Sequence, residues 1–201
     1  MRLFVAIELD AGNRRAIAAE QARLMATATE GAGSTLRWVR PEHMHLTLAF
    51  LGEVSEERVR PLVIVMAEPI QQRPFVLGFG GLGIFPPHGA PRVLWLGVIR
   101  GVSELRAVQE AVLGRLFGAG STLPERFQPH LTLARWRAGT GGRRVRRRSV
   151  TDLDQHRELF QLTVESVALI ESRLSSAGPA HEVLARGRLE GDRVPPLQSG
   201  A

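Results

Sequence analysis

Two identical five-residue segments, HLTLA, contain the residues of this chain that are best suited to acid–base chemistry. The first covers residues 45–49 and the second 130–134, and together they hold two of the six histidines. An imidazole has an unperturbed pKa of about 6.5, so near neutral pH one histidine can accept a proton while another donates one. The threonine two residues after each histidine offers a hydroxyl donor to anionic oxygens. Arranged around one void, these groups would suit cleavage of a phosphodiester by positioning and charge stabilisation.

The alternation of polar and apolar residues in the repeat is typical of a β-strand. Side chains alternate between the two faces of a strand, so His45 and Thr47 share one face while the leucines of the segment share the other. His130 and Thr132 have the same arrangement in the second copy. The leucines would pack in the core, and the polar side chains would line a surface outside it. If an approximate twofold axis relates the two halves, both strands lie near it and the four polar side chains face one cleft.

The expected helices and strands place both copies in the same context. Helices are predicted by runs of alanine, arginine, glutamate and glutamine, with glycine or proline beyond their ends. Each HLTLA follows a strand and a helix, which indicates a loose internal duplication. The expected helices cover residues 11–29, 55–67, 103–117 and 152–159. The expected strands cover residues 3–9, 38–51, 75–85, 92–98, 127–134, 162–174 and 181–189.

The segments WVRPEHMHLTLAFLGEV and FQPHLTLAR resemble the two signature segments of the 2H phosphoesterase superfamily. The opening RLFVAIEL is similar to that of its RNA 2′,3′-cyclic phosphodiesterase branch, whose members are also called 2′-5′ RNA ligases. The resemblance runs from Arg2 to about Leu189. It implies an α+β fold of two similar lobes, each an antiparallel sheet with helices packed outside. A pseudo-twofold axis would relate the lobes, with a central cleft between them.

The same resemblance implies one bilobal domain over residues 1–190. The two copies of its four-residue motif would lie at 45–48 and 130–133, and residues 191–201 would form a flexible tail.

The resemblance further implies hydrolysis of RNA 2′,3′-cyclic phosphodiester ends to 2′-phosphomonoester ends, without a metal or another cofactor. A water attacks the cyclic phosphate and the 3′-oxygen leaves. The family pattern implies His45 as the proton donor and His130 as the proton acceptor, with Thr47 and Thr132 beside them. Arg135, three residues after the second threonine, matches the family's usual arginine and is expected to contact the phosphate or a base. The partner would be RNA with 2′,3′-cyclic phosphate ends, tRNA fragments among them.

Three alternatives to hydrolysis stay open. An RNA 5′-hydroxyl attacking the cyclic phosphate would use the same groups and make a 2′-5′ bond. The substrate could instead be another small cyclic phosphate. The chain could also be a non-catalytic RNA-binding module. An ATP-driven ligase is disfavoured because the sequence lacks a glycine loop of the Walker type.

Aromatic residues near the motifs are candidates for stacking on bases. Phe4 is the strongest of them, because Leu3, Val5 and Ile7 would form the opposite, packed face of its strand. Most aromatic residues in strands belong to the core, and this applies to the remaining candidates, Trp38, Trp95 and Trp136.

The other histidines suggest few alternatives. His43 lies two residues before His45, so the two could form a metal pair with His130 as a third ligand. The family resemblance implies no metal, which favours His43 as a residue at the end of a strand. The remaining histidines lie in loop-like or polar contexts and are expected at the surface: His88, His156 and His181.

The basic residues favour a polyanionic partner. All 26 are arginine, the net charge is +6, and the planar guanidinium suits phosphate and stacks on bases. Five of them follow the second motif closely and form either a solvated loop or a landing surface for an RNA backbone. They are Arg143, Arg144, Arg146, Arg147 and Arg148.

Composition also limits the expected location. There is no cysteine, which excludes disulfide and thiolate chemistry. The N-terminal apolar run is too short for a signal peptide, and no run approaches the roughly 18 residues of a membrane span. We therefore expect a cytoplasmic protein, a monomer, with no membrane partner.

Overall fold

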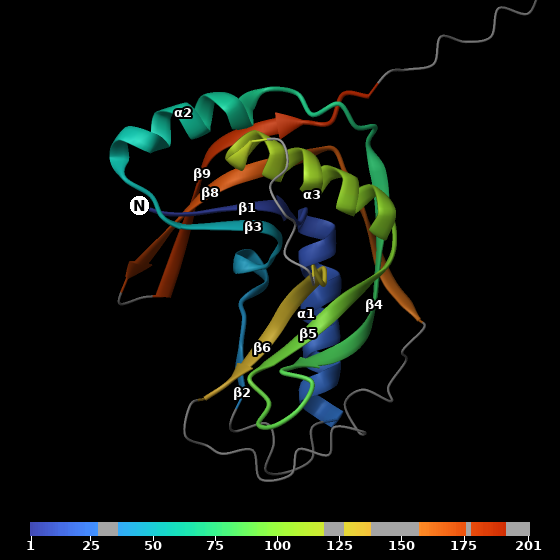
Figure 1. The fold of residues 1–201 in the computed structure, drawn as a ribbon. Coiled ribbons are helices and arrows are strands. Elements are labelled where there is room, and N and C mark those ends of the chain that lie inside the picture. The colour runs from blue at the N-terminus through green and yellow to red at the C-terminus, as the bar shows by residue number, and fades with distance from the viewer. Residues whose placement is uncertain (28–35, 119–126, 138–156, 176–177, 192–201) are drawn as a thin grey trace, which may run out of the picture.

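Two antiparallel sheets form the frame of the molecule in the computed structural model, which describes residues 1–27, 36–118, 127–137, 157–175 and 178–191 (Figure 1). The first sheet has the order β3 (His45–Glu53), β1 (Arg2–Glu8), β8 (Ser166–Ser175) and β9 (Gly178–Arg188). The second has the order β2 (Leu36–Trp38), β6 (His130–Trp136), β5 (Val93–Arg100), β4 (Phe75–Phe85) and β7 (Glu158–Val164).

The two sheets repeat one strand order. The order β3-β1-β8-β9 of the first sheet corresponds to β6-β5-β4-β7 of the second, and β2 is added beside β6. In the first sheet the HLTLA strand β3 pairs antiparallel with β1, and in the second the HLTLA strand β6 pairs antiparallel with β5. In each pair an α-helix lies between the two strands in the sequence. The expected α+β fold of two similar antiparallel lobes is confirmed. The extent of one domain over 1–190 stays a prediction, and the expected tail beyond residue 191 lies outside the described residues.

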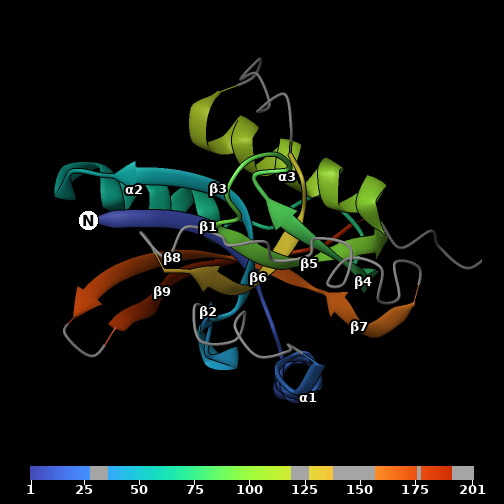
Figure 2. The same ribbon diagram turned by 90° about the horizontal axis from the view of Figure 1, so that it is seen from below.

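The helices that connect paired strands pack on the opposite lobe. Helix α1 (Ala11–Thr27) connects strands of the first lobe yet packs against β7 of the second sheet. Helix α3 (Val102–Phe117) follows β5 of the second sheet but packs mainly against β3 and α2 (Glu56–Ala67), with a smaller contact to β4 of the second sheet. Figure 1 shows α2 and α3 over the first sheet, and Figure 2 shows α1 on the other side of the molecule. Each sheet is therefore covered by a helix from the other half of the duplication.

Local chemistry explains where these helices lie. Asp10 caps α1, because its carboxylate accepts a hydrogen bond of 2.7 Å from the backbone N–H of Asn13. Helix α3 buries Leu105, Val108 and Val112 at the three- and four-residue spacing of one helix face. None of the helices in the described ranges is long and apolar enough to cross a lipid bilayer.

Three of the expected elements are wrong in detail. The strand expected over 38–51 is interrupted by a 3-10 helix, η2 (Pro41–His43), because a proline cannot donate a ladder hydrogen bond. The strand expected over 162–174 breaks at Glu165, where the chain leaves β7 for β8 of the other sheet. The short helix expected over 152–159 is contradicted at its end, where β7 begins at Glu158; residues 152–156 lie outside the described ranges.

Candidate active site

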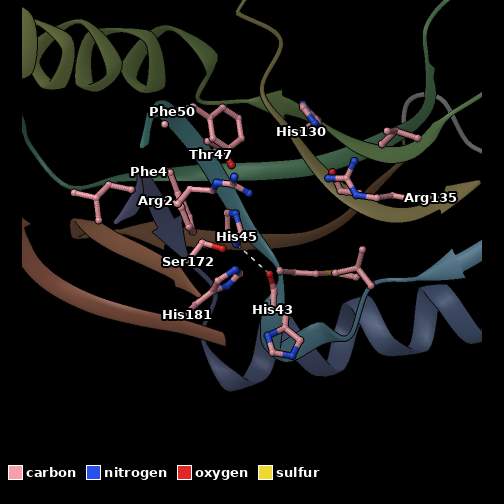
Figure 3. A pocket seen from close by; sticks show the side chains of 16 residues that line it. Arg2, Phe4, His43, His45, Thr47, Phe50, His130, Arg135, Ser172 and His181 are labelled. Carbon is pink, nitrogen blue, oxygen red and sulfur yellow. Dashed lines mark hydrogen bonds between the residues drawn. The ribbon is translucent and has the colours of Figure 1, made fainter. Parts of the chain in front are cut away.

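A pocket of about 550 Å³ is lined by side chains of both sheets (Figure 3). His45 and Thr47 reach it from β3, and His130 and Thr132 reach it from β6, which contacts β3. Figure 3 shows His45 on one side of the pocket and His130 with Arg135 on the other. Folding therefore brings both copies of HLTLA to one cavity.

Each motif strand carries a β-bulge at the same place. The pairing of β3 with β1 skips Leu48, and the pairing of β6 with β5 skips Leu133. An extra residue shifts the alternation of side chains by one position. Phe50 and Arg135, each three residues after a motif threonine, therefore line the pocket together with the histidines. Strict alternation would have turned both side chains toward the core.

Both histidines are oriented by the same hydrogen bond. Nδ1 of His45 lies 3.0 Å from the carbonyl oxygen of His43, and Nδ1 of His130 lies 2.8 Å from that of Gln128. A carbonyl oxygen only accepts, so Nδ1 must carry the hydrogen in each ring. In the neutral ring Nε2 then has a free lone pair, so Nε2 is the nitrogen available for proton transfer.

Aromatic rings pack against each imidazole. The ring centroids of Phe4 and His181 lie 4.6 Å and 5.2 Å from that of His45. Those of Phe85 and Trp95 lie 5.0 Å and 6.1 Å from that of His130. These contacts fix the planes of both rings in the pocket wall.

Burial makes His45 hard to protonate. The pKa of His45 is lowered to about 4, and burial is the largest cause. The neighbouring imidazole of His181 contributes next, and Arg135 and His43 contribute less. The bond to the carbonyl of His43 acts in the opposite direction. In the free protein His45 is therefore neutral at neutral pH.

His130 and His181 show weaker forms of the same effect. Burial lowers the pKa of His130, and Arg135 adds to this, while the bond to the carbonyl of Gln128 raises it. Burial also lowers the pKa of His181, with a smaller contribution from His43. The pocket thus favours neutral imidazoles, and an anion bound there would reverse this preference.

The two aromatic residues of the pocket differ in accessibility. Phe4 is only 4% exposed and packs against His45 and His181, whereas Phe50 is 77% exposed. Arg135 is exposed and reaches the pocket from β6. The role of Phe4 in base stacking stays a prediction. Its buried ring packs against the imidazole of His45 and can hold that imidazole in place. Phe50 presents the open ring that stacking requires.

His43 lies at the end of η2 and not on the strand of His45. Its ring centroid lies 5.7 Å from that of His181. Within the described ranges, no group of three or more histidine, aspartate or glutamate side chains could hold a metal ion.

The sequence predicted His181 at the surface, and this prediction is wrong. Its side chain lines the pocket beside His45. It lies on β9, directly opposite Ser172 of β8, and is half-buried. The polar neighbours in sequence were misleading, because β9 belongs to the same sheet as β3 and its side chains reach the same cavity. His88 is exposed, as expected.

Other predicted residues lie away from the pocket or outside the described residues. Trp38 and Trp136 are partly buried and pack against the core, and Trp95 packs beside His130. The five arginines of 143–148 and His156 lie outside the described residues.

Sequence reasoning missed Phe50 and His181. Phe50 occupies the position in the first motif that Arg135 occupies in the second, and this match was the signal that could have found it. The sequence around His181 carries no such signal, because its place depends on the pairing of β8 with β9.

Comparison with known proteins agrees with this geometry. The family model described as LigT like phosphoesterase matches residues 12–95. A relative from Thermotoga maritima, named RNA 2′,3′-cyclic phosphodiesterase, is 30% identical over 202 residues, covering 96% of this chain and 98% of that protein. One of the same name from Aquifex aeolicus is 32% identical over 162 residues, covering 77% and 82%. The chain belongs to the LigT-like (2H) phosphoesterase family.

Solved structures place the fold in the same family. The crystal structure of E. coli LigT complexed with 3′-AMP has a TM-score of 0.69 and 27% identity, covering 94% of this chain and 97% of that one. The 2H phosphoesterase resemblance of the two HLTLA segments is thereby confirmed.

Proposed function

We propose that this protein hydrolyses the 2′,3′-cyclic phosphate at the end of an RNA to a 2′-phosphomonoester, using His45 and His130 and no metal. The observation that carries the proposal is the single pocket lined by both motif histidines and both motif threonines. The names of the relatives from Thermotoga maritima and Aquifex aeolicus support it, since both are RNA 2′,3′-cyclic phosphodiesterases. The 3′-AMP bound to E. coli LigT supports a nucleotide as the occupant.

The reaction is an in-line displacement at phosphorus. Nε2 of His130 takes a proton from a water, whose oxygen forms a bond to phosphorus. The bond from phosphorus to the 3′-oxygen breaks, and Nε2 of His45 gives its proton to that oxygen. The products are a 2′-phosphate and a free 3′-hydroxyl. The opposite placement of the two rings across the pocket suits attack and departure on opposite sides of phosphorus (Figure 3).

Three other groups would hold the phosphate. The hydroxyls of Thr47 and Thr132 line the pocket and can donate to the non-bridging oxygens. The guanidinium of Arg135 offers charge-assisted bonds to the same oxygens. Donors fixed in this way stabilise the charge that develops on the phosphoryl group.

Binding of the substrate would favour the protonated form of His45, which is the form that an acid requires. Its pKa of about 4 leaves it neutral in the free protein near pH 7. A phosphodiester anion placed beside the ring favours the protonated form and raises this pKa. Binding and protonation of His45 are therefore coupled, and the acid forms mainly when its substrate is present.

The terminal nucleobase would stack on Phe50, the exposed aromatic ring of the pocket. We propose that the protein acts as a monomer. RNA fragments ending in a cyclic phosphate, halves of cleaved tRNA included, are the proposed substrates.

The direct test uses an RNA oligonucleotide with a 2′,3′-cyclic phosphate end, incubated with the enzyme in excess chelator. Phosphorus NMR identifies the product as a 2′-phosphate or 3′-phosphate. We expect the 2′-phosphate with the wild type, and a loss of roughly 100-fold or more in His45→Ala and in His130→Ala, in keeping with general acid–base catalysis. Activity that disappears with chelator, or survives in either variant, contradicts the proposal.

The same reaction mixture separates the alternatives. With a second RNA that ends in a 5′-hydroxyl, a 2′-5′ joined product would indicate ligation by the same groups. Binding without turnover, unaffected by both histidine substitutions, would indicate a non-catalytic RNA-binding module.

A further inference from the structure

Two buried glutamines contact the two motif strands at their bulges. Gln109 of α3 is 1% exposed, and its side-chain Nε2 donates a hydrogen bond of 2.9 Å to the carbonyl oxygen of Leu48. Gln21 of α1 is 5% exposed, and its Nε2 donates one of 3.0 Å to the carbonyl oxygen of Leu133. Leu48 and Leu133 are the residues that the strand pairing skips directly after each motif threonine, and β3 skips Leu51 as well.

The two contacts follow the exchange of helices between the lobes. Helix α1 belongs to the first half and reaches the bulge of β6, whereas α3 belongs to the second half and reaches the bulge of β3. Gln21 also donates 2.9 Å to the carbonyl oxygen of Val39, whose own N–H donates 2.9 Å to that of Leu133. The amide of Gln21 thus bridges the chain before η2 to the bulge of β6.

A bulge interrupts the regular ladder, so the carbonyl of the extra residue needs a donor from outside the strand pair. The carbonyl of Leu48 accepts from Gln109, whereas that of Leu133 accepts from both Gln21 and the backbone N–H of Val39. Loss of Gln21 therefore removes one of two bonds at Leu133. A buried carbonyl without a donor is costly, whereas a satisfied one fixes the local backbone. A strand without the bulge would return to strict alternation and turn the residue three positions after the threonine toward the core. The bulge therefore decides the direction of Arg135 in β6 and of Phe50 in β3.

We propose that Gln21 and Gln109 are positioning residues: Gln21 holds the bulge that turns Arg135 into the pocket, and Gln109 holds the bulge that turns Phe50 into it. Neither glutamine touches the substrate. Gln21 acts on phosphate binding through Arg135, and Gln109 acts on base binding through Phe50. The consequence for catalysis, but not the structural effect, rests on the proposed cyclic phosphodiesterase function.

Gln21 is tested with inorganic phosphate as the probe, measured by calorimetry. Gln21→Met keeps the volume of the side chain but removes the donor. We expect it to weaken phosphate binding about tenfold, a size typical of coupled neighbours. In the Arg135→Ala background the same substitution is expected to change the affinity less than twofold, because the residue through which it acts is gone. Equal losses in both backgrounds would overturn the assignment.

Gln109 is tested by steady-state kinetics with adenosine 2′,3′-cyclic phosphate. Gln109→Met and Phe50→Ala are each expected to raise KM roughly fivefold to tenfold with little change in kcat, since a stacked base contributes mainly to binding. The double variant should resemble Phe50→Ala alone. A fall in kcat with an unchanged KM, or effects that multiply, would overturn this half of the proposal.

Buried aliphatic residues on the same helices provide matched controls. Ile17 of α1 and Val112 of α3 are both fully buried, and Ile17→Ala and Val112→Ala should lower Tm at least as much as the glutamine variants. Phosphate affinity and KM should stay unchanged in both, measured well below Tm. If the controls reproduce the losses, the glutamines act only through stability.

Crystal structures of Gln21→Met and Gln109→Met give a readout that is independent of activity. We expect Arg135 or Phe50, respectively, to leave the pocket and the strand register at Leu133 or Leu48 to change. An unchanged bulge and side chain would overturn the inference even if the enzyme is active. If the wild type is inactive but the two variants show these structural changes, the proposed function is rejected and the positioning role of the glutamines is kept.

Discussion

At the scale of single residues, the motif histidines are held alike but surrounded differently. Each donates from Nδ1 to the carbonyl of the residue two positions before it. His45 also packs against another imidazole, that of His181, whereas His130 packs against Phe85 and Trp95. The fold therefore gives different proton affinities to two residues that the repeat makes identical, and the larger lowering of the pKa is at His45. In the free protein a single proton therefore favours His130, and the proposed acid, His45, is protonated mainly when the anionic substrate is bound beside it.

This difference predicts an acidic optimum for kcat/KM. The active form carries one proton on the two rings, so it declines above the pKa of His130, which lies below 6.5, and below the pKa of His45 of about 4. We expect kcat/KM to fall about tenfold per pH unit on the alkaline side, because one proton is lost. Bound substrate raises the pKa values, so the profile of kcat should lie at higher pH. A flat kcat/KM between pH 5 and 8 would contradict these shifts.

The contact with His181 predicts a second change. In His181→Gln the second-largest cause that lowers the pKa of His45 is removed, so this pKa should rise from about 4 while burial still holds it below 6.5. Titration of the imidazole signals by NMR measures the pKa directly. His88→Gln is the matched control, because His88 is exposed and lies outside the pocket, and it should leave the pKa of His45 unchanged.

At the scale of elements, the pair β4–β5 supports the wall of the pocket beside His130. Gly83 of β4 lies opposite Trp95 of β5, and a Cβ atom at Gly83 would overlap the indole ring. Phe85 of the same strand packs against both Trp95 and His130. The absence of a side chain at Gly83 thus leaves room for the indole of Trp95 beside His130.

Gly83→Ala is therefore expected to displace Trp95 and, with it, His130. Overpacking of this kind destabilises by about 1–3 kcal/mol, and we also expect kcat to fall. Urea unfolding followed by tryptophan fluorescence measures the first effect and steady-state kinetics the second. Gly114→Ala in α3 is the control, since a Cβ there meets nothing within 4 Å and alanine favours a helix. Equal behaviour of the two variants would refute the role given to Gly83.

The sequence predicted the motif strands well and their details poorly. The repeated HLTLA was sufficient to predict that His45 shares a strand face with Thr47, and His130 with Thr132, because alternation over three residues needs no tertiary information. The bulges at Leu48 and Leu133 were not visible, since they depend on the register with β1 and β5. Arg135 was expected in the site only by resemblance, although its odd spacing from Thr132 already required a bulge.

At the scale of the whole molecule, the buried imidazole of His45 links stability to pH. Its pKa is lowered from 6.5 to about 4 by folding, so its contribution is fully present above pH 6.5 and is lost as the pH falls toward 4. The loss amounts to roughly 3 kcal/mol in the free energy of unfolding, from about 1.4 kcal/mol per pKa unit. Urea unfolding at several pH values should show a shallower dependence in His45→Asn than in the wild type. Parallel dependences would indicate that other groups dominate.

Whole-molecule arrangement was only partly accessible from the sequence. The duplication predicted two lobes and a shared cleft, and the two sheets repeat one strand order. The place of His181 was not predictable, because it depends on the pairing of β9 with β8, and β8 pairs with β1 from the opposite end of the chain. Contacts between segments so far apart leave no trace in local patterns.

The exchange of α1 and α3 makes the two lobes depend on each other. A fragment with one HLTLA strand would expose the apolar face that a helix from the other half now covers. The first sheet also takes β8 and β9 from the C-terminal end of the chain. Neither half can therefore be cut away without uncovering the other, and the two lobes should unfold as one cooperative unit.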